Sequence, residues 1–115
     1  MVKIERLRNS EDILKVLRSN KKCFSNVATL TYLKNNVQSP RVAIIVSKKI
    51  SNKAVVRNKV KRQIRAIIRE LNMILPNQDM VIIAKSTWLD GDFTNNKKIV
   101  RGLLKKAGGS LINGN

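Results

Sequence analysis

The sequence predicts an α+β domain with elements in the order α-β-β-β-α-β-α and a mainly antiparallel central sheet with helices packed on it. Three observations predict this class: an amphipathic segment opens the chain, short β-branched runs follow it, and two segments of helical periodicity flank a further β-branched run. The 115 residues contain no internal repeat and no Pro/Gly-rich break in the middle. We therefore expect residues 1–115 to form a single domain, with 1–5 and 108–115 as loose tails.

The first helix is predicted to follow residues 9–12, where Asn9 or Ser10 can cap it and two acids favour the positive end of the helix dipole. Ile13, Leu14 and Leu17 form its apolar stripe, and the helix should end near Asn20.

Strands are predicted from β-branched and apolar runs. Residues 22–33 suit one strand, or a short strand followed by a longer one, and residues 35–40 form a turn. Residues 42–46 are a continuous apolar run that indicates a central strand, and 79–84 form another strand.

Residues 56–71 have the most regular helical pattern in the chain. A last helix is predicted with Thr94 or Asn95 as its cap and Gly108 and Gly109 at its end.

Charge is the strongest functional signal: 24 Lys and Arg against 7 Asp and Glu give a net charge of +17. Such self-repulsion destabilises a compact monomer, so a polyanionic partner is expected. Nucleic acid is the leading candidate. A membrane surface is a weaker candidate partner, because the cations are spread along the chain and do not line one long amphipathic helix.

The chain has no histidine and one cysteine, Cys23, which we expect to be a small buried side chain. Imidazole chemistry, Cys/His zinc sites and an internal disulfide are therefore excluded, and an independent enzyme is not expected. Asp90-Gly91-Asp92 suits a turn better than a metal site. With no signal sequence or apolar span, the cytoplasm is the expected location.

The predicted second helix divides into two faces. Val60, Ile64, Ile67, Ile68 and Leu71 fall on one side, and Asn58, Lys61, Arg62, Arg65 and Arg69 on the other. An ordinary solvated face is the alternative, but such faces mix signs, and Glu70 is the only acid between residues 48 and 73. We expect the arginines to bind phosphates in a forked geometry, Asn58 to bind a base edge or a 2′-hydroxyl, and Lys48, Lys49 and Lys53 to extend the surface.

Ser47-Lys48-Lys49 followed by Arg57-Asn58-Lys59-Val60-Lys61-Arg62-Gln63-Ile64-Arg65 resembles the strand end and basic helix of the bacterial ribonuclease P protein family. Residues 6–13 and 79–85 resemble two further stretches of that family, so the resemblance covers about residues 5 to 107.

The resemblance implies a subunit of ribonuclease P, the ribonucleoprotein that removes the 5′ leader from precursor tRNA. The RNA subunit and substrate hold Mg²⁺ and the RNA subunit performs the hydrolysis, so no protein residue is catalytic or a metal ligand. The RNA subunit would contact Arg57, Asn58, Lys61, Arg62 and Arg65. The leader would lie in a cleft lined by Ile13, Leu17, Thr31 and Tyr32, where the family often has aromatic residues in place of Ile13 and Leu17.

Precursor tRNA and the ribonuclease P RNA are the expected partners, with no membrane and no required protein partner. A structural ribosomal protein is the main alternative, because it too is small, basic and poor in aromatic residues. A non-specific nucleic-acid-coating protein is the third.

Overall fold

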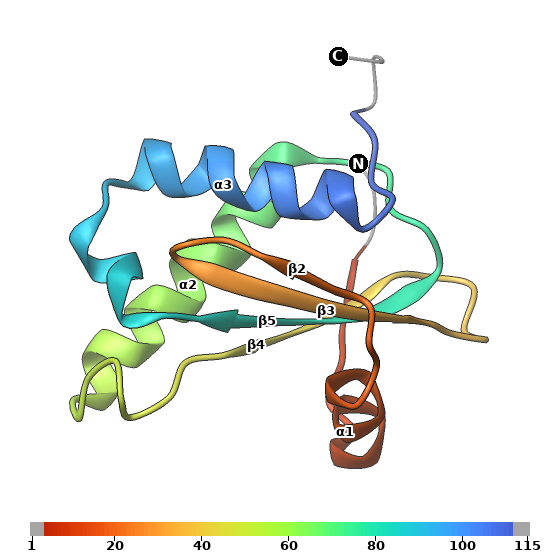
Figure 1. Cartoon of the computed structure of the whole chain (residues 1–115), viewed down its shortest axis with the longest axis horizontal. Helices are drawn as coiled ribbons and strands as arrows, with labels where there is room; N and C mark the ends of the chain where they lie inside the picture. Colours follow the sequence, from red (N-terminus) through yellow and green to blue (C-terminus); the bar gives the residue numbers. More distant parts are fainter. Residues whose placement is uncertain (1–3, 112–115) are drawn as a thin grey trace.

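In a computed structural model, which describes residues 4–111, a five-stranded sheet has α1 on one face and α2 and α3 on the other (Figure 1). The strands are β1 (Glu5–Arg6), β2 (Lys22–Phe24), β3 (Ala28–Lys34), β4 (Arg41–Ile45) and β5 (Gln78–Ala84). The helices are α1 (Ser10–Leu17), α2 (Ala54–Leu71), the short 3₁₀ helix η1 (Ser86–Asp90) and α3 (Phe93–Lys106). No helix in this part of the chain is long and apolar enough to cross a membrane.

The sheet is mixed, with the strand order β1-β4-β5-β3-β2. The strands β2, β3 and β5 pair in antiparallel fashion, whereas β4 is parallel to both β5 and β1. The predicted α+β class and element order are confirmed, with β1 and η1 added. Both additions are too short to produce a periodic pattern in the sequence.

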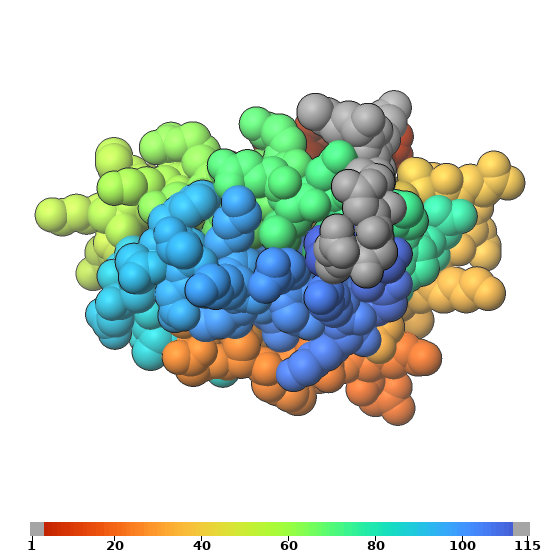
Figure 2. Space-filling view, turned by 90° about the horizontal axis from the view of Figure 1, so that it is seen from above, coloured from red at the N-terminus to blue at the C-terminus, as the bar shows by residue number. Residues whose placement is uncertain are grey.

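Residues alternate between two apolar cores, one on each side of the sheet. On the α1 face, Val16 of α1 packs with Leu7, Ala43 and Val81. On the α2/α3 face, a larger core surrounds Trp88, which is 2% exposed. Figure 2 views this side, where α3 and α2 lie side by side.

The cap of α1 is the predicted one, since Asn9 Oδ1 accepts hydrogen bonds from the backbone N–H groups of Glu11 at 2.9 Å and Asp12 at 3.1 Å. The helix ends three residues before the predicted Asn20. There the Ser19 N–H donates to the carbonyl of Val16, which tightens the last turn.

The predicted cap of α3 was wrong, because Asp92 fills that position. Its Oδ1 accepts from the backbone N–H of Asn95 at 2.7 Å. The preceding η1 ends at Asp90 and leaves Asp92 extended (φ −88°, ψ 163°), the conformation that an N-cap requires. Asp92 therefore has a structural role at this helix start.

The expected loose tails are only partly tested, because residues 1–3 and 112–115 lie outside the described residues. The expectation was wrong for Glu5, which pairs with Arg41 in the sheet, and for 108–111. Ser110 exchanges two backbone hydrogen bonds with Ile74, at 2.8 and 2.9 Å. Gly109 donates to the carbonyl of Leu104 at 2.8 Å, so the chain is tied to the α2/α3 core after α3 ends.

Candidate nucleic-acid interface

Helix α2 separates apolar and basic side chains as predicted. Val60, Ile64, Ile67 and Ile68 are buried against the sheet and α3. On the other side, Asn58, Arg62 and Arg69 are exposed, and Lys61 and Arg65 are half-buried. The hydrophobic face fixes the rotation of the helix, and this rotation leaves the cations at the surface.

Arg65 lies at the centre of an arginine cluster that includes Arg6 and Arg8. Burial lowers the pKa of Arg65 from its ordinary value, and the positive charges of Arg6 and Arg8 lower it further. A guanidinium stays protonated despite such a shift, so the three positive charges persist and repel one another. An anion placed among them would relieve their repulsion.

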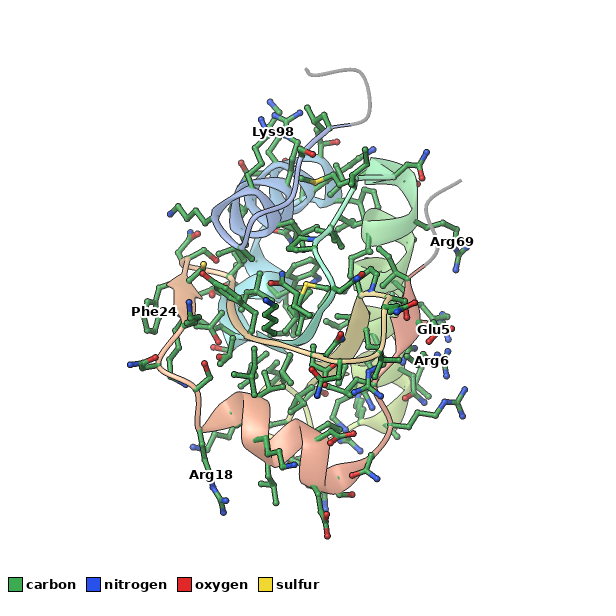
Figure 3. All side chains as sticks on the ribbon, turned by 90° about the vertical axis from the view of Figure 1, so that its right-hand side faces the viewer. Glu5, Arg6, Arg18, Phe24, Arg69 and Lys98 are labelled. Carbon is green, nitrogen blue, oxygen red and sulfur yellow. The ribbon has the colours of Figure 1, made fainter. Side chains whose placement is uncertain are left out.

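Strand β1 brings Arg6 to this cluster. Arg6 pairs with Val42 at the sheet edge and lies on the α2/α3 face, and Figure 3 shows it on the same side of the molecule as Arg69. Arg6 and Arg8 were not among the predicted binding residues, because no strand was predicted at residues 5–6. Their alternation around the buried Leu7 was the available signal.

The loop before α2 adds three exposed cations, Lys48, Lys49 and Lys53. Arg57 differs from them, because it is half-buried and its Nη1 donates to the carbonyl of Ser51 at 2.9 Å. Part of its donor capacity therefore holds the loop against the start of α2.

We call the resulting set the basic surface: Arg6, Arg8, Lys48, Lys49, Lys53, Arg57, Asn58, Lys61, Arg62, Arg65 and Arg69.

Several carboxylates form their contacts away from this surface. Asp79 accepts from Arg41 Nε and Nη2, both at 2.7 Å, and this bond raises the pKa of Arg41. Glu70 lies on α2, but it pairs with Lys97 of α3 at 2.8 Å. These acids are occupied by structural contacts and do not neutralise the arginine cluster.

The predicted cleft residues do not all lie together. Ile13 and Leu17 of α1 are half-buried on the α1 face, and Thr31 of β3 points to the same face but is only 2% exposed. Tyr32 packs against the core of the α2/α3 face, so its placement in this cleft was wrong. The reason is the two-residue period of a strand, which sends neighbouring side chains to opposite faces.

Phe24 is an exposed aromatic residue that was not among the predicted cleft residues. It pairs with Thr29 across β2 and β3, while Cys23 beside it is buried on the α2/α3 face, so alternation places Phe24 on the α1 face. Phe24 is 65% exposed and lies at the β2 edge, opposite the Arg6 edge (Figure 3).

Half-buried Thr29, Ile45 and Ile83 lie between Phe24 and the loop before α2, and we call these four residues the open sheet face. The sequence carries no clear signal for Phe24, because Lys22, Cys23 and Phe24 are polar, apolar and apolar, and their exposed-buried-exposed alternation emerges only in the structure.

The comparisons with known proteins agree on one family. The family model for Ribonuclease P matches residues 1–108. The chain belongs to the ribonuclease P protein family.

A ribonuclease P protein component from Bacillus velezensis is 38% identical over 107 residues, covering 92% of this chain and 91% of the relative. One from Ureaplasma urealyticum is 32% identical, covering 93% and 94%. The structure of the RNase P protein from Thermotoga maritima matches with a TM-score of 0.78 and 30% identity over 89% of this chain and 96% of that one.

Membership in the ribonuclease P protein family makes the chain a protein component of this ribonucleoprotein endoribonuclease and decides against the ribosomal alternative. Within residues 4–111, no three acidic or cysteine side chains gather as they would to hold a metal ion.

Proposed function

We propose that the basic surface binds the RNA subunit of ribonuclease P and that the open sheet face holds the 5′ leader of precursor tRNA. The observation that carries the proposal is the cluster of Arg65 with Arg6 and Arg8. These three like charges come from α2, from β1 and from the residues that follow β1, and Arg65 is half-buried. Such a cluster is costly in a free protein and favourable against RNA phosphates. Arg62 and the lysines of the preceding loop continue the positive surface.

The leader would extend from the loop before α2 across the sheet towards Phe24. Ile45 ends β4, and Val46 alone separates it from Ser47-Lys48-Lys49, so the open sheet face is continuous with the basic surface. Ile13 and Leu17 border this face from α1. Phe24 would stack on a base, which compensates for aliphatic residues at positions 13 and 17.

Hydrolysis is assigned to the RNA subunit, with Mg²⁺ held by that RNA and the substrate. The protein would screen phosphate repulsion where the two RNAs meet, without a catalytic side chain of its own. We further infer a cytoplasmic complex that requires no other protein.

The experiment is cleavage of a precursor tRNA by a bacterial ribonuclease P RNA at low, near-physiological magnesium, with and without this protein. Stimulation of correct 5′ cleavage is expected. If an RNA that is active at high magnesium gains nothing from the protein, the proposed role is wrong.

The variants Arg62→Ala and Arg65→Ala test the basic surface. Each should weaken binding to the RNA subunit about tenfold and reduce the slope of log affinity against log salt by about one. Lys98→Ala and Arg101→Ala remove exposed cations from α3 and serve as charge-matched controls. If the control variants weaken RNA binding as much as Arg62→Ala and Arg65→Ala do, the loss comes from net charge and not from the basic surface.

Phe24→Ala tests the open sheet face separately. One base stack contributes about 1–3 kcal/mol, so affinity for precursor tRNA should fall roughly tenfold while affinity for mature tRNA stays unchanged. If the affinities for precursor and mature tRNA fall equally, Phe24 does not bind the leader.

A further inference from the structure

A hollow of about 360 Å³ lies on the α2/α3 face at the end of β3 and shares no lining residue with the basic surface. Its lining residues are Lys21, Tyr32, Lys34, Pro76, Asn77 and Gln78, which include two lysines and no acid. This volume lies at the small end of the range for ligand sites, roughly 300–1,000 Å³.

The sheet brings these side chains together. Tyr32 and Lys34 are two residues apart on β3 and therefore share a face, and the Tyr32 N–H donates to the carbonyl of Lys21 at 3.1 Å. Lys34 pairs with Gln78 of β5. Gln78 Nε2 in turn donates to the carbonyl of Ala107 at 3.0 Å, which ties this wall to the end of α3.

The hollow thus combines an aromatic ring, two cations and amide groups. Inorganic phosphate would use the lysines but leave the ring and much of the volume unused. A planar base can stack on Tyr32 while its phosphate meets Lys21 and Lys34, and Asn77 offers both a donor and an acceptor to a base edge. The acidic Asp79 next to Gln78 belongs to the other face, where Arg41 neutralises it.

We propose that this hollow binds a nucleotide, with its base on Tyr32 and its phosphate between Lys21 and Lys34. The nucleotide can be free or part of a single-stranded RNA segment. The site lies on the face opposite the open sheet face, so it does not rest on the proposed leader path.

Tyr32 is the only tyrosine in the chain, so its ring protons give an unambiguous NMR signal. Titrating the full chain with AMP at fixed ionic strength should shift the ring signals and the amides of Lys34 and Asn77 in a saturable manner. Inorganic phosphate should leave the ring signals unmoved, and adenosine should bind more weakly than AMP.

The variants separate stacking from charge. Lys21→Ala combined with Lys34→Ala should weaken AMP binding about tenfold. Tyr32→Phe should keep the affinity, and Tyr32→Leu should lose it. Lys98→Ala combined with Arg101→Ala removes the same charge from exposed positions of α3 and should change nothing.

A short oligoadenylate distinguishes the two sources of the nucleotide. Tighter binding of the oligomer than of AMP at Tyr32 assigns the site to RNA, and equal binding assigns it to free nucleotides. The proposal is overturned if neither ligand moves the Tyr32 ring, if an acidic peptide moves it equally, or if shifts are confined to α2. These titrations contain no RNA subunit, so their outcome is independent of the cleavage assay.

Discussion

Replacing Arg41 by methionine should destabilise the fold strongly, because it leaves a buried carboxylate without its cation. The Asp79 side chain is 9% exposed and accepts two bonds of 2.7 Å from Arg41. Breaking a buried pair by removing one partner costs about 3–5 kcal/mol. We expect about 3 kcal/mol, since Asn35 Nδ2 still donates to Asp79 at 2.8 Å and Arg41 itself is 20% exposed.

The matched control is Lys97→Met, which removes the same charge from an ion pair with Glu70. Those side chains are 36% and 51% exposed, and exposed pairs contribute only about 0–1 kcal/mol. Urea unfolding followed by the fluorescence of the single, buried Trp88 measures both variants.

A second substitution tests the cause. Asp79→Asn in the Arg41→Met background removes the stranded charge and should recover part of the lost stability. If Arg41→Met costs no more than Lys97→Met, or if Asp79→Asn recovers nothing, the buried carboxylate is not the source of the effect.

Two glycines and the cysteine give further predictions. Gly109→Ala should lower the free energy of unfolding in urea by about 1–3 kcal/mol, because its Cβ would lie 2.8 Å from the Leu104 carbonyl oxygen. Gly102→Ala meets nothing within 4 Å and lies within a helix, so it should raise that free energy by about 0.5–1 kcal/mol; changes of the same sign in both variants would contradict this reasoning. Burial raises the pKa of Cys23, and the positive charge of Lys106 partly offsets this rise. Alkylation of the thiol near pH 8, monitored by mass spectrometry, should therefore be slow, and slower still in Lys106→Ala. Faster alkylation in that variant would mean that Lys106 shields the thiol.

Periodicity in the sequence was sufficient to predict the long elements. Helix α2 could be predicted with both of its faces because eighteen residues repeat one amphipathic pattern. Cys23 is buried as expected, at 8% exposure. The alternation of β3 also predicts that Thr31 and Tyr32 lie on opposite faces, and grouping them in one cleft overlooked that rule.

The remaining features depend on contacts between distant segments. The two residues of β1 form a strand only because β4 offers a free edge, and the brief alternation at residues 6–8 does not indicate which edge they join. Arg6 and Arg8 therefore join Arg65 through tertiary structure alone. The cap of α3 similarly depends on how η1 positions Asp92.

The placement of three acids helps to explain how so basic a chain can fold and still present a strongly positive surface. Asp79 and Asp12 both lie against Arg41, and Glu70 faces Lys97, so these acids neutralise cations outside the arginine cluster. Repulsion among Arg6, Arg8 and Arg65 is then left for a partner to relieve, and the apolar cores must offset it in the free protein. The half-buried charge of Arg65 on α2 therefore lowers the stability of the free protein and at the same time favours RNA binding.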